Sequence, residues 1–214
     1  MGADAEYHDM MMFNRQTAAI LTATLVMVAP GDTVIGASPT YSHPCVTRAV
    51  ERAGAKFVDT VGVTAFSAAF DAAHAAGETV SVVALTRLAV SYEIMAERDI
   101  EKIIAIARSA GAKILVDDAG GARVGPAVFN QPKSLEFDVD IASTGLDKYG
   151  TIGPRLGLLA GDAQLVADIR AFPHSTSLGI SCPILMVRNQ RLRMRHRRSL
   201  DRWLIVRSCL MKWL

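Results

Sequence analysis

Asp117 and Asp118 end a run of aliphatic residues in the stretch ILVDDAGGARVG, which spans 114–125. A buried carboxylate costs free energy unless it is paired, so we expect a hydrogen-bond or charge partner at this position. Asp117 could pair with a cationic ring nitrogen or a metal ion, or either Asp could simply cap a helix or lie at the surface. Ala119 would point to the same side as Asp117 and offer a small apolar contact beside it.

Lys148 is the second candidate for a chemical role, and it lies 31 residues after Asp117. A lysine in a dry pocket near other cations has a lowered pKa, and its amine can then form a Schiff base with a carbonyl. Ser143 and Thr144 end the strand expected just before it, and their hydroxyls could serve phosphate oxygens. The alternative interpretation of Lys148 is an ordinary solvated lysine in a loop.

A phosphate site is predicted at the start of the first helix, in the segment Asn-Arg-Gln-Thr-Ala at 14–18. A helix amino end presents free N–H groups and a partial positive charge, which together hold anions. Arg15 would add a charge and the Thr17 hydroxyl a donor. Many helices begin with Thr and bind nothing, so this signal gains weight only beside Asp117 and Lys148.

Strands and helices alternate along the chain, and this order predicts where the candidate side chains lie. The expected strands are 33–38, 55–61, 79–86, 112–118, 139–144 and 156–161. The expected helices are 16–28, 44–53, 65–76, 97–110 and 162–171. The alternation is typical of a three-layer α/β/α fold with a mostly parallel sheet covered on both faces. Such an open sheet binds ligands beyond the carboxyl ends of its strands, which is where Asp117 falls.

Composition narrows the class of protein. Half of the 214 residues are hydrophobic, which is enough for a sizeable core. The sequence has no charge-free run of 18 apolar residues, so we expect no membrane span. The first residues lack the pattern of a secretory signal. The three cysteines have no metal-ligand spacing, so we expect free thiols in a reducing cytoplasm and no metal site. They are Cys45, Cys182 and Cys209.

Residues 188–214 differ from the rest, with nine Lys or Arg against one acid, Asp201. Residues 1–187 carry an excess of acids, which argues against nucleic-acid binding by that part. The basic tail could be an RNA-binding or membrane-surface helix, or a solvated terminus or out-of-frame end, and we favour the second pair of interpretations. We therefore divide the chain into a large domain at 1–187 and a tail at 188–214.

The order of these features resembles the fold-type-I enzymes that use pyridoxal 5′-phosphate (PLP). The stretches that carry the resemblance lie within 13–185 and are FNRQTAAIL, VDDAGGARVG followed by FNQP, and STGLDKYGTIGPRLGLLAG. The motifs are most similar to the group of selenocysteine synthase (seryl-tRNA selenium transferase) and its uncharacterised PLP-dependent relatives. The resemblance implies the large domain of the aspartate-aminotransferase-like fold.

The resemblance also implies a role for each catalytic candidate. Lys148 would form the Schiff base with PLP, and Asp117 would bind the pyridine nitrogen. Ala119 would pack on one face of the ring. His43 or Tyr41, both in the loop SPTYSHP, would cover the other face, and His43 is the preferred residue.

Arginine and hydroxyl side chains would hold the phosphate of the cofactor and the carboxylate of the substrate. The residues expected at the phosphate are Arg15, Gln16 and Thr17, with Ser143 or Thr144. Arg155 would meet either the phosphate or a substrate carboxylate. Arg123 would instead be structural and bond loop carbonyls around Asp118.

The implied function is a PLP-dependent transferase or lyase that acts on an amino acid or aminoacyl group, most simply by β-elimination or replacement. The alternatives are an aminotransferase or a non-catalytic α/β domain that binds a nucleotide or a partner protein. A nucleotide domain would show Gly-x-Gly-x-x-Gly or a phosphate-loop lysine, and the sequence has neither.

Relatives in this group carry a segment before the first helix and a smaller carboxyl-terminal domain, which usually supplies an arginine for the substrate carboxylate. The resemblance fades after Met186. We therefore expect an incomplete amino terminus and a missing or degraded small domain. The resemblance further implies a small amino-acid-like substrate, a homodimer or higher homo-oligomer, tRNA as a partner of the basic tail, no membrane contact and a cytoplasmic location.

Overall fold

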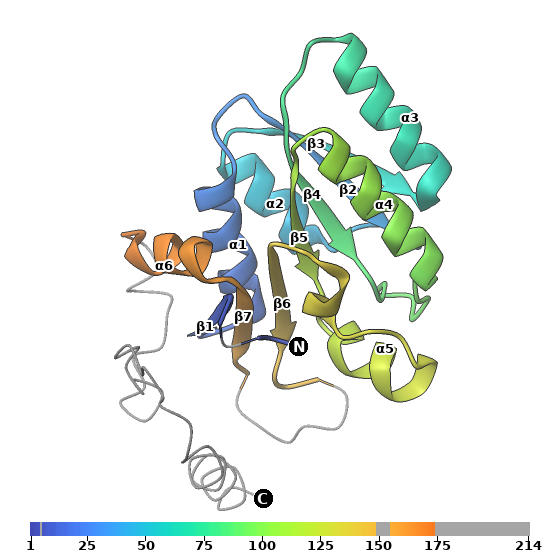
Figure 1. Cartoon of the computed structure of the whole chain (residues 1–214). Coiled ribbons are helices and arrows are strands. Elements are labelled where there is room, and N and C mark those ends of the chain that lie inside the picture. Colours follow the sequence, from blue (N-terminus) through green and yellow to red (C-terminus); the bar gives the residue numbers. More distant parts are fainter. Residues whose placement is uncertain (5, 149–154, 174–214) are drawn as a thin grey trace, which may run out of the picture.

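The computed structural model describes residues 1–4, 6–148 and 155–173. Figure 1 shows one sheet in this part of the chain, with helices on both of its faces. The strands are β1 (His8–Phe13), β2 (Thr33–Ser38), β3 (Lys56–Val61), β4 (Val80–Thr86), β5 (Lys113–Asp117), β6 (Ile141–Gly145) and β7 (Gly157–Asp162). The helices are α1 (Gln16–Met27), α2 (Pro44–Arg52), α3 (Gly62–Ala75), α4 (Glu97–Ser109), α5 (Gly121–Phe129) and α6 (Ala163–Ala171), with a 3-10 turn η1 at Ser134–Phe137.

The seven strands have the order β1-β7-β6-β5-β4-β2-β3. From β6 to β3 every neighbouring pair is parallel, whereas β7 runs antiparallel to both β6 and β1. The predicted three-layer α/β fold with a mostly parallel sheet is therefore confirmed. Since parallel strands carry their carboxyl ends to one edge, the ends of β2, β4, β5 and β6 lie together there.

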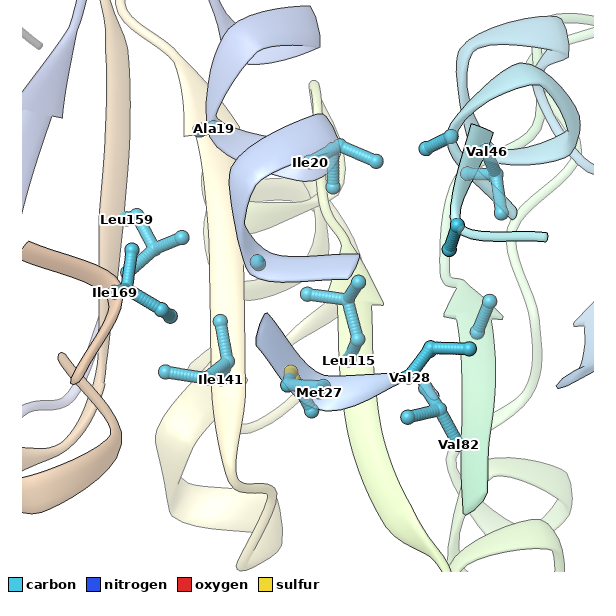
Figure 2. Close-up of a cluster of buried hydrophobic side chains, with 14 of the residues drawn as sticks. Ala19, Ile20, Met27, Val28, Val46, Val82, Leu115, Ile141, Leu159 and Ile169 are labelled. Carbon is cyan, nitrogen blue, oxygen red and sulfur yellow. The ribbon is translucent and has the colours of Figure 1, made fainter. Parts of the chain in front are cut away.

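Each face of the sheet has its own apolar core. The first core joins the sheet to α1, α2 and α6, and Figure 2 shows Ile20 and Met27 of α1 over Leu115 and Ile141 of the sheet. The second core joins the opposite face to α3 and α4. Because side chains alternate along a strand, Asp117 points to the same face as Leu115. The carboxylate is therefore directed toward the layer that holds α1.

Three elements were not predicted, namely β1, α5 and η1. The α5 sequence GARVGPAVF contains two glycines and Pro126, which disfavour a helix on local grounds. β1 is the edge strand beside β7, and of its residues Phe13 alone is fully buried, so it lacks a clear alternating pattern.

No helix among the described residues is long and apolar enough to cross a membrane. Residues 174–187 of the predicted domain and the whole basic tail lie outside the described ranges, as do Cys182 and Cys209. The division of the chain at 187 therefore stays a prediction.

Candidate functional site

A cavity of about 370 Å³ opens at the carboxyl ends of the strands, beside the amino end of α1. The residues that line it are Arg15, Gln16, Thr17, His43, Cys45, Asp117, Ala119, Asp147, Lys148 and Arg155. Eight of the eleven predicted site residues are among them, although they come from distant parts of the chain. Cys45 and Asp147 were not predicted.

Asp117 ends β5 and is 4% exposed. Burial and the neighbouring charge of Asp118 raise the pKa of this carboxyl to about 6, while the charge of Lys148 and two hydrogen bonds oppose the rise. One of those bonds comes from the backbone N–H of Ala119. The carboxylate is therefore ionised at neutral pH, although it titrates close to that range.

Gln16 makes contacts other than the expected one with phosphate. Its amide Nε2 donates to Asp117 Oδ1 at 2.7 Å and to the carbonyl of Ser143 at 3.1 Å. Gln16 is the first residue of α1, which packs on the sheet face that carries Asp117, so the side chain reaches the sheet. With both amide hydrogens used, only its carbonyl oxygen remains, and an acceptor cannot bind phosphate.

The amino end of α1 provides the anion-binding features that the sequence predicts. Arg15 is the N-cap, no side chain caps the helix, and its first turn contains no acidic residue. Arg15 and Thr17 are exposed and line the cavity, as does Arg155. Among the described residues, no carboxylate forms an ion pair with either arginine. Free N–H groups and two arginines thus face one volume, which favours an anionic ligand.

Lys148 lies three residues after the end of β6, in the loop that begins there, and its exposed side chain lines the cavity. Arg123 of α5 fixes this loop, because its Nη2 donates to the carbonyls of Gly145 and Lys148, each at 2.6 Å. The prediction that Arg123 bonds loop carbonyls is confirmed, but the loop is that of Lys148 and the expected place around Asp118 was wrong.

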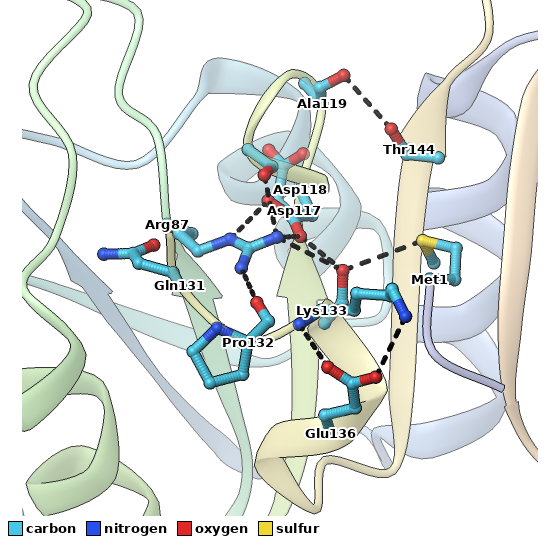
Figure 3. Close-up of polar contacts among 12 residues, drawn as sticks. Met1, Arg87, Asp117, Asp118, Ala119, Gln131, Pro132, Lys133, Glu136 and Thr144 are labelled. Carbon is cyan, nitrogen blue, oxygen red and sulfur yellow. Dashed lines mark hydrogen bonds and ion pairs between the residues drawn. The ribbon is translucent and has the colours of Figure 1, made fainter. Parts of the chain in front are cut away.

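Asp118 has a structural role that differs from that of its neighbour. It is fully buried and pairs with Arg87, which is 1% exposed and follows β4 (Figure 3). The guanidinium also donates to the carbonyls of Gly121 at 2.8 Å and Pro132 at 2.7 Å. This network holds the loop after β5 in place. The adjacent carboxylates are thus divided between a ligand cavity and a buried ion pair.

Three predicted residues do not line the cavity. Ser143 is fully buried in β6, level with Asp117, and its backbone carbonyl accepts the amide of Gln16. Thr144 points to the other face and its hydroxyl donates to the carbonyl of Ala119 at 3.2 Å (Figure 3). Tyr41 is 47% exposed. His43 is therefore the one of the two loop residues that lines the cavity. Ser143 and Thr144 do not line it, so a phosphate contact by either of them stays a prediction.

His43 and Cys45 stand at the start of α2. His43 is the N-cap, and its Nδ1 accepts the backbone N–H of Cys45 at 3.1 Å. Burial and the charge of Lys148 lower the pKa of His43, which favours the neutral imidazole. Burial and the charge of Asp117 raise the pKa of the Cys45 thiol to about 12. The signal that could have revealed Cys45 is its spacing, two residues after His43 in the same helix turn.

Ligand-type atoms of His43, Cys45 and Asp117 lie within 4.8 Å of one another. Arg15, Lys148 and Arg155 line the same cavity, however, and their positive charge opposes a metal cation. The arrangement instead suits an organic ligand with an anionic group near α1, a cationic nitrogen near Asp117 and a carbonyl near Lys148.

Comparison with known proteins found relatives of this chain, although no family model matches it. It is 34% identical to a UPF0425 pyridoxal phosphate-dependent protein of Methanothermobacter thermautotrophicus, over 81% of this chain and 44% of the relative. It is 27% identical to the UPF0425 protein of Methanosphaera stadtmanae, over 81% of this chain and 43% of the relative. The chain thus spans less than half the length of these two curated relatives.

Solved structures share the fold. N-succinyldiaminopimelate aminotransferase from Mycobacterium tuberculosis aligns with a TM-score of 0.68 and 21% identity, over 86% of this chain and 49% of that one. SepCysS, in its complex with the SepCysE N-terminal domain, aligns with a TM-score of 0.64 and 16% identity, over 77% and 44% of the two chains. The chain is therefore related to the UPF0425 pyridoxal phosphate-dependent proteins and has the fold of the fold-type-I PLP enzymes.

Proposed function

We propose that this chain binds PLP and acts as a PLP-dependent enzyme on an amino acid or aminoacyl group. The observation that carries the proposal is that Lys148 and Asp117 line one cavity together with the amino end of α1. An amine, a buried carboxylate and an anion site are the three groups that a pyridine aldehyde with a phosphate requires. The curated relatives are named as pyridoxal phosphate-dependent proteins, which supports the same cofactor.

The residues present fit each part of the cofactor. The amine of Lys148 would hold the aldehyde covalently, and Asp117 would meet the ring nitrogen. Ala119 and His43 line the cavity and would cover the two ring faces. The phosphate would lie at the free N–H groups of α1, and Arg15, Thr17 and Arg155 line the same cavity.

When bound, PLP supplies an electron sink that stabilises negative charge on the substrate Cα. The side chains of the protein would hold and move the protons at the cofactor and the substrate. Asp117, with a pKa of about 6, is ionised at neutral pH and would keep a hydrogen-bonded ring nitrogen protonated. The amine of Lys148, when it does not hold the cofactor, would be the base that takes a proton from the substrate.

The reaction that we propose is β-elimination or replacement, as a selenium transferase or lyase would catalyse. The motif resemblance of 13–21 and 143–161 supports this choice. Transamination is the alternative within the same class. We further propose an amino-acid-like substrate and a homo-oligomer as the working form.

Absorption spectroscopy tests the cofactor directly. Adding PLP to the purified chain should produce a visible band, and borohydride reduction should fix one PLP on Lys148, as read by peptide mass spectrometry. Lys148→Ala should lose both signals. Lys102→Ala, at an exposed position on α4, is the matched control and should keep them. The absence of a band and of a labelled Lys148 in the unchanged chain would refute the proposal.

A panel of amino acids then identifies the reaction. β-Elimination releases a keto acid and ammonia from substrates that carry a leaving group on Cβ, without an added keto acid. Transamination instead requires a keto acid as the acceptor of the amino group. Keto-acid-dependent turnover without release of ammonia would overturn the elimination proposal while leaving the cofactor proposal intact.

A further inference from the structure

The side-chain amide of Gln16 joins three elements that are distant in the sequence. It donates to Asp117, which lies 101 residues away, and to the backbone of Ser143, which lies 127 residues away. The bonds tie α1 to the ends of β5 and β6. Both amide hydrogens are used, so the orientation of the amide is fixed at two points.

The position of Gln16 depends on a close approach between the backbones of α1 and β7. A Cβ at Gly157 would come within 2.6 Å of backbone atoms of both Arg15 and Gln16. Gly157 is the first residue of β7, so the absence of a side chain there lets the start of α1 lie directly against the sheet. Gln16 is thereby close enough to reach Asp117.

The two oxygens of Asp117 consequently have different surroundings. Oδ1 accepts the amide of Gln16, whereas Oδ2 accepts the thiol of Cys45, another residue that lines the cavity, at 4.0 Å. The bond to Oδ1 restricts rotation of the carboxylate. The thiol at Oδ2 is distant and a weak donor, so Oδ2 can still accept a hydrogen bond from a ligand. A neutral donor suits this task, because a cation at position 16 would repel a protonated ring nitrogen and an anion would repel Asp117 itself.

We propose that Gln16 is a positioning residue that holds the carboxylate of Asp117 so that Oδ2 meets the ring nitrogen of the bound cofactor. This inference rests on the proposed function, since the ring nitrogen belongs to PLP. It replaces the phosphate contact expected for Gln16 with a contact at the opposite end of the ligand.

A double-mutant cycle separates this role from simple tethering of α1. Gln16→Met keeps the length of the side chain and removes both donors, and it should weaken PLP binding at least about tenfold and shift the absorption maximum of the bound cofactor. In the Asp117→Asn background, Gln16→Met should change the affinity less than about twofold. Gln164→Met is the matched control, because Gln164 makes the same type of bond to Asp168 on the exposed face of α6, at 2.9 Å.

A measurement without cofactor keeps the two proposals distinguishable. The NMR signals of the Gln16 side-chain amide should shift on Asp117→Asn and stay in place on Asp168→Asn. An amide signal that does not shift on Asp117→Asn overturns the positioning role. A tenfold loss of PLP affinity on Gln16→Met that persists in the Asp117→Asn background overturns it as well. If the unchanged chain binds no PLP, the proposed function fails, and with it the cofactor part of this inference.

Discussion

Arg87 and Asp118 form an ion pair whose side chains are 1% and 0% exposed, and Asp118 is the residue next to Asp117 in the chain. Arg87 follows β4 and Asp118 follows β5, so the pair joins neighbouring strands at the edge that carries the cavity. Ser134 adds a further hydrogen bond to Asp118. The pair therefore fixes the loop from which Asp117 and Ala119 reach the ligand.

Breaking this pair should destabilise the fold strongly. Arg87→Met leaves the charge of Asp118 buried without its partner, and we expect the free energy of unfolding to fall by about 3–5 kcal/mol. Arg98→Met is the control, because Arg98 is 81% exposed and lies 3.8 Å from Asp99. Its loss should cost less than about 1 kcal/mol. Urea denaturation measures both, and equal effects of the two substitutions would contradict the structural role of Arg87.

The fold was predictable where the pattern is local. Helix α4 repeats Ile100, Ile103 and Ile104 on one face, and these residues are buried as expected. Helix α5 could not be predicted, because Gly121 and Pro126 disfavour a helix and the stabilising contact comes from elsewhere. That contact is the bond from Arg87 to the carbonyl of Gly121, which joins residues 34 positions apart.

The sequence predicted most of the residues that line the site but few of the contacts between them. Asp117 and Lys148 could be placed together because parallel strands bring their carboxyl ends to one edge. The partner of Gln16 could not be found, because a helix start with free N–H groups suggests phosphate and nothing local reveals a carboxylate 101 residues away. Arg87 was missed for the same reason.

The stability of the ligand-free chain should fall as the pH rises from about 4 to about 6. The pKa of Asp117 is raised from 3.8 to about 6 in the folded chain, so the folded state binds more protons than the unfolded state in this window. Folding favours the protonated form, and up to about 3 kcal/mol is lost by pH 7. Asp117→Asn removes this titration and should be the more stable protein at pH 7. Thermal unfolding across pH measures the difference, and a gap that does not narrow toward pH 4 would contradict it.

Arg15 should act on the phosphate of the cofactor and on no other part. Arg15→Gln removes a charge at the amino end of α1, and we expect PLP affinity to fall about tenfold. Pyridoxal, which has the same ring without the phosphate, should bind equally to the variant and to the unchanged chain. Arg52→Gln, at the far end of α2, is the control and should leave both affinities as they are. An equal loss for PLP and pyridoxal would remove Arg15 from the phosphate site.

A side chain at Gly157 should displace the start of α1. In Gly157→Ala the new Cβ meets the backbone of Gln16 at 2.6 Å, and neither β7 nor α1 can move freely. We expect a loss of about 1–3 kcal/mol in unfolding free energy, together with weaker PLP binding. Binding that stays unchanged despite lower stability would show that the anion site does not depend on this close approach.

Cys45 should be nearly inert toward alkylation while the chain is folded. The pKa of its thiol is raised from 9.0 to about 12, because burial and the nearby Asp117 carboxylate disfavour the thiolate. Since only the thiolate reacts, iodoacetamide at pH 8 should modify Cys45 about a thousandfold more slowly in the folded chain than in urea. Mass spectrometry of the peptide that contains residue 45 follows the reaction. Asp117→Asn removes the nearby negative charge and should speed the labelling, whereas Asp168→Asn on α6 should not. Rapid labelling of the folded chain would place the thiol outside the cavity wall and contradict the contact between Cys45 and Asp117.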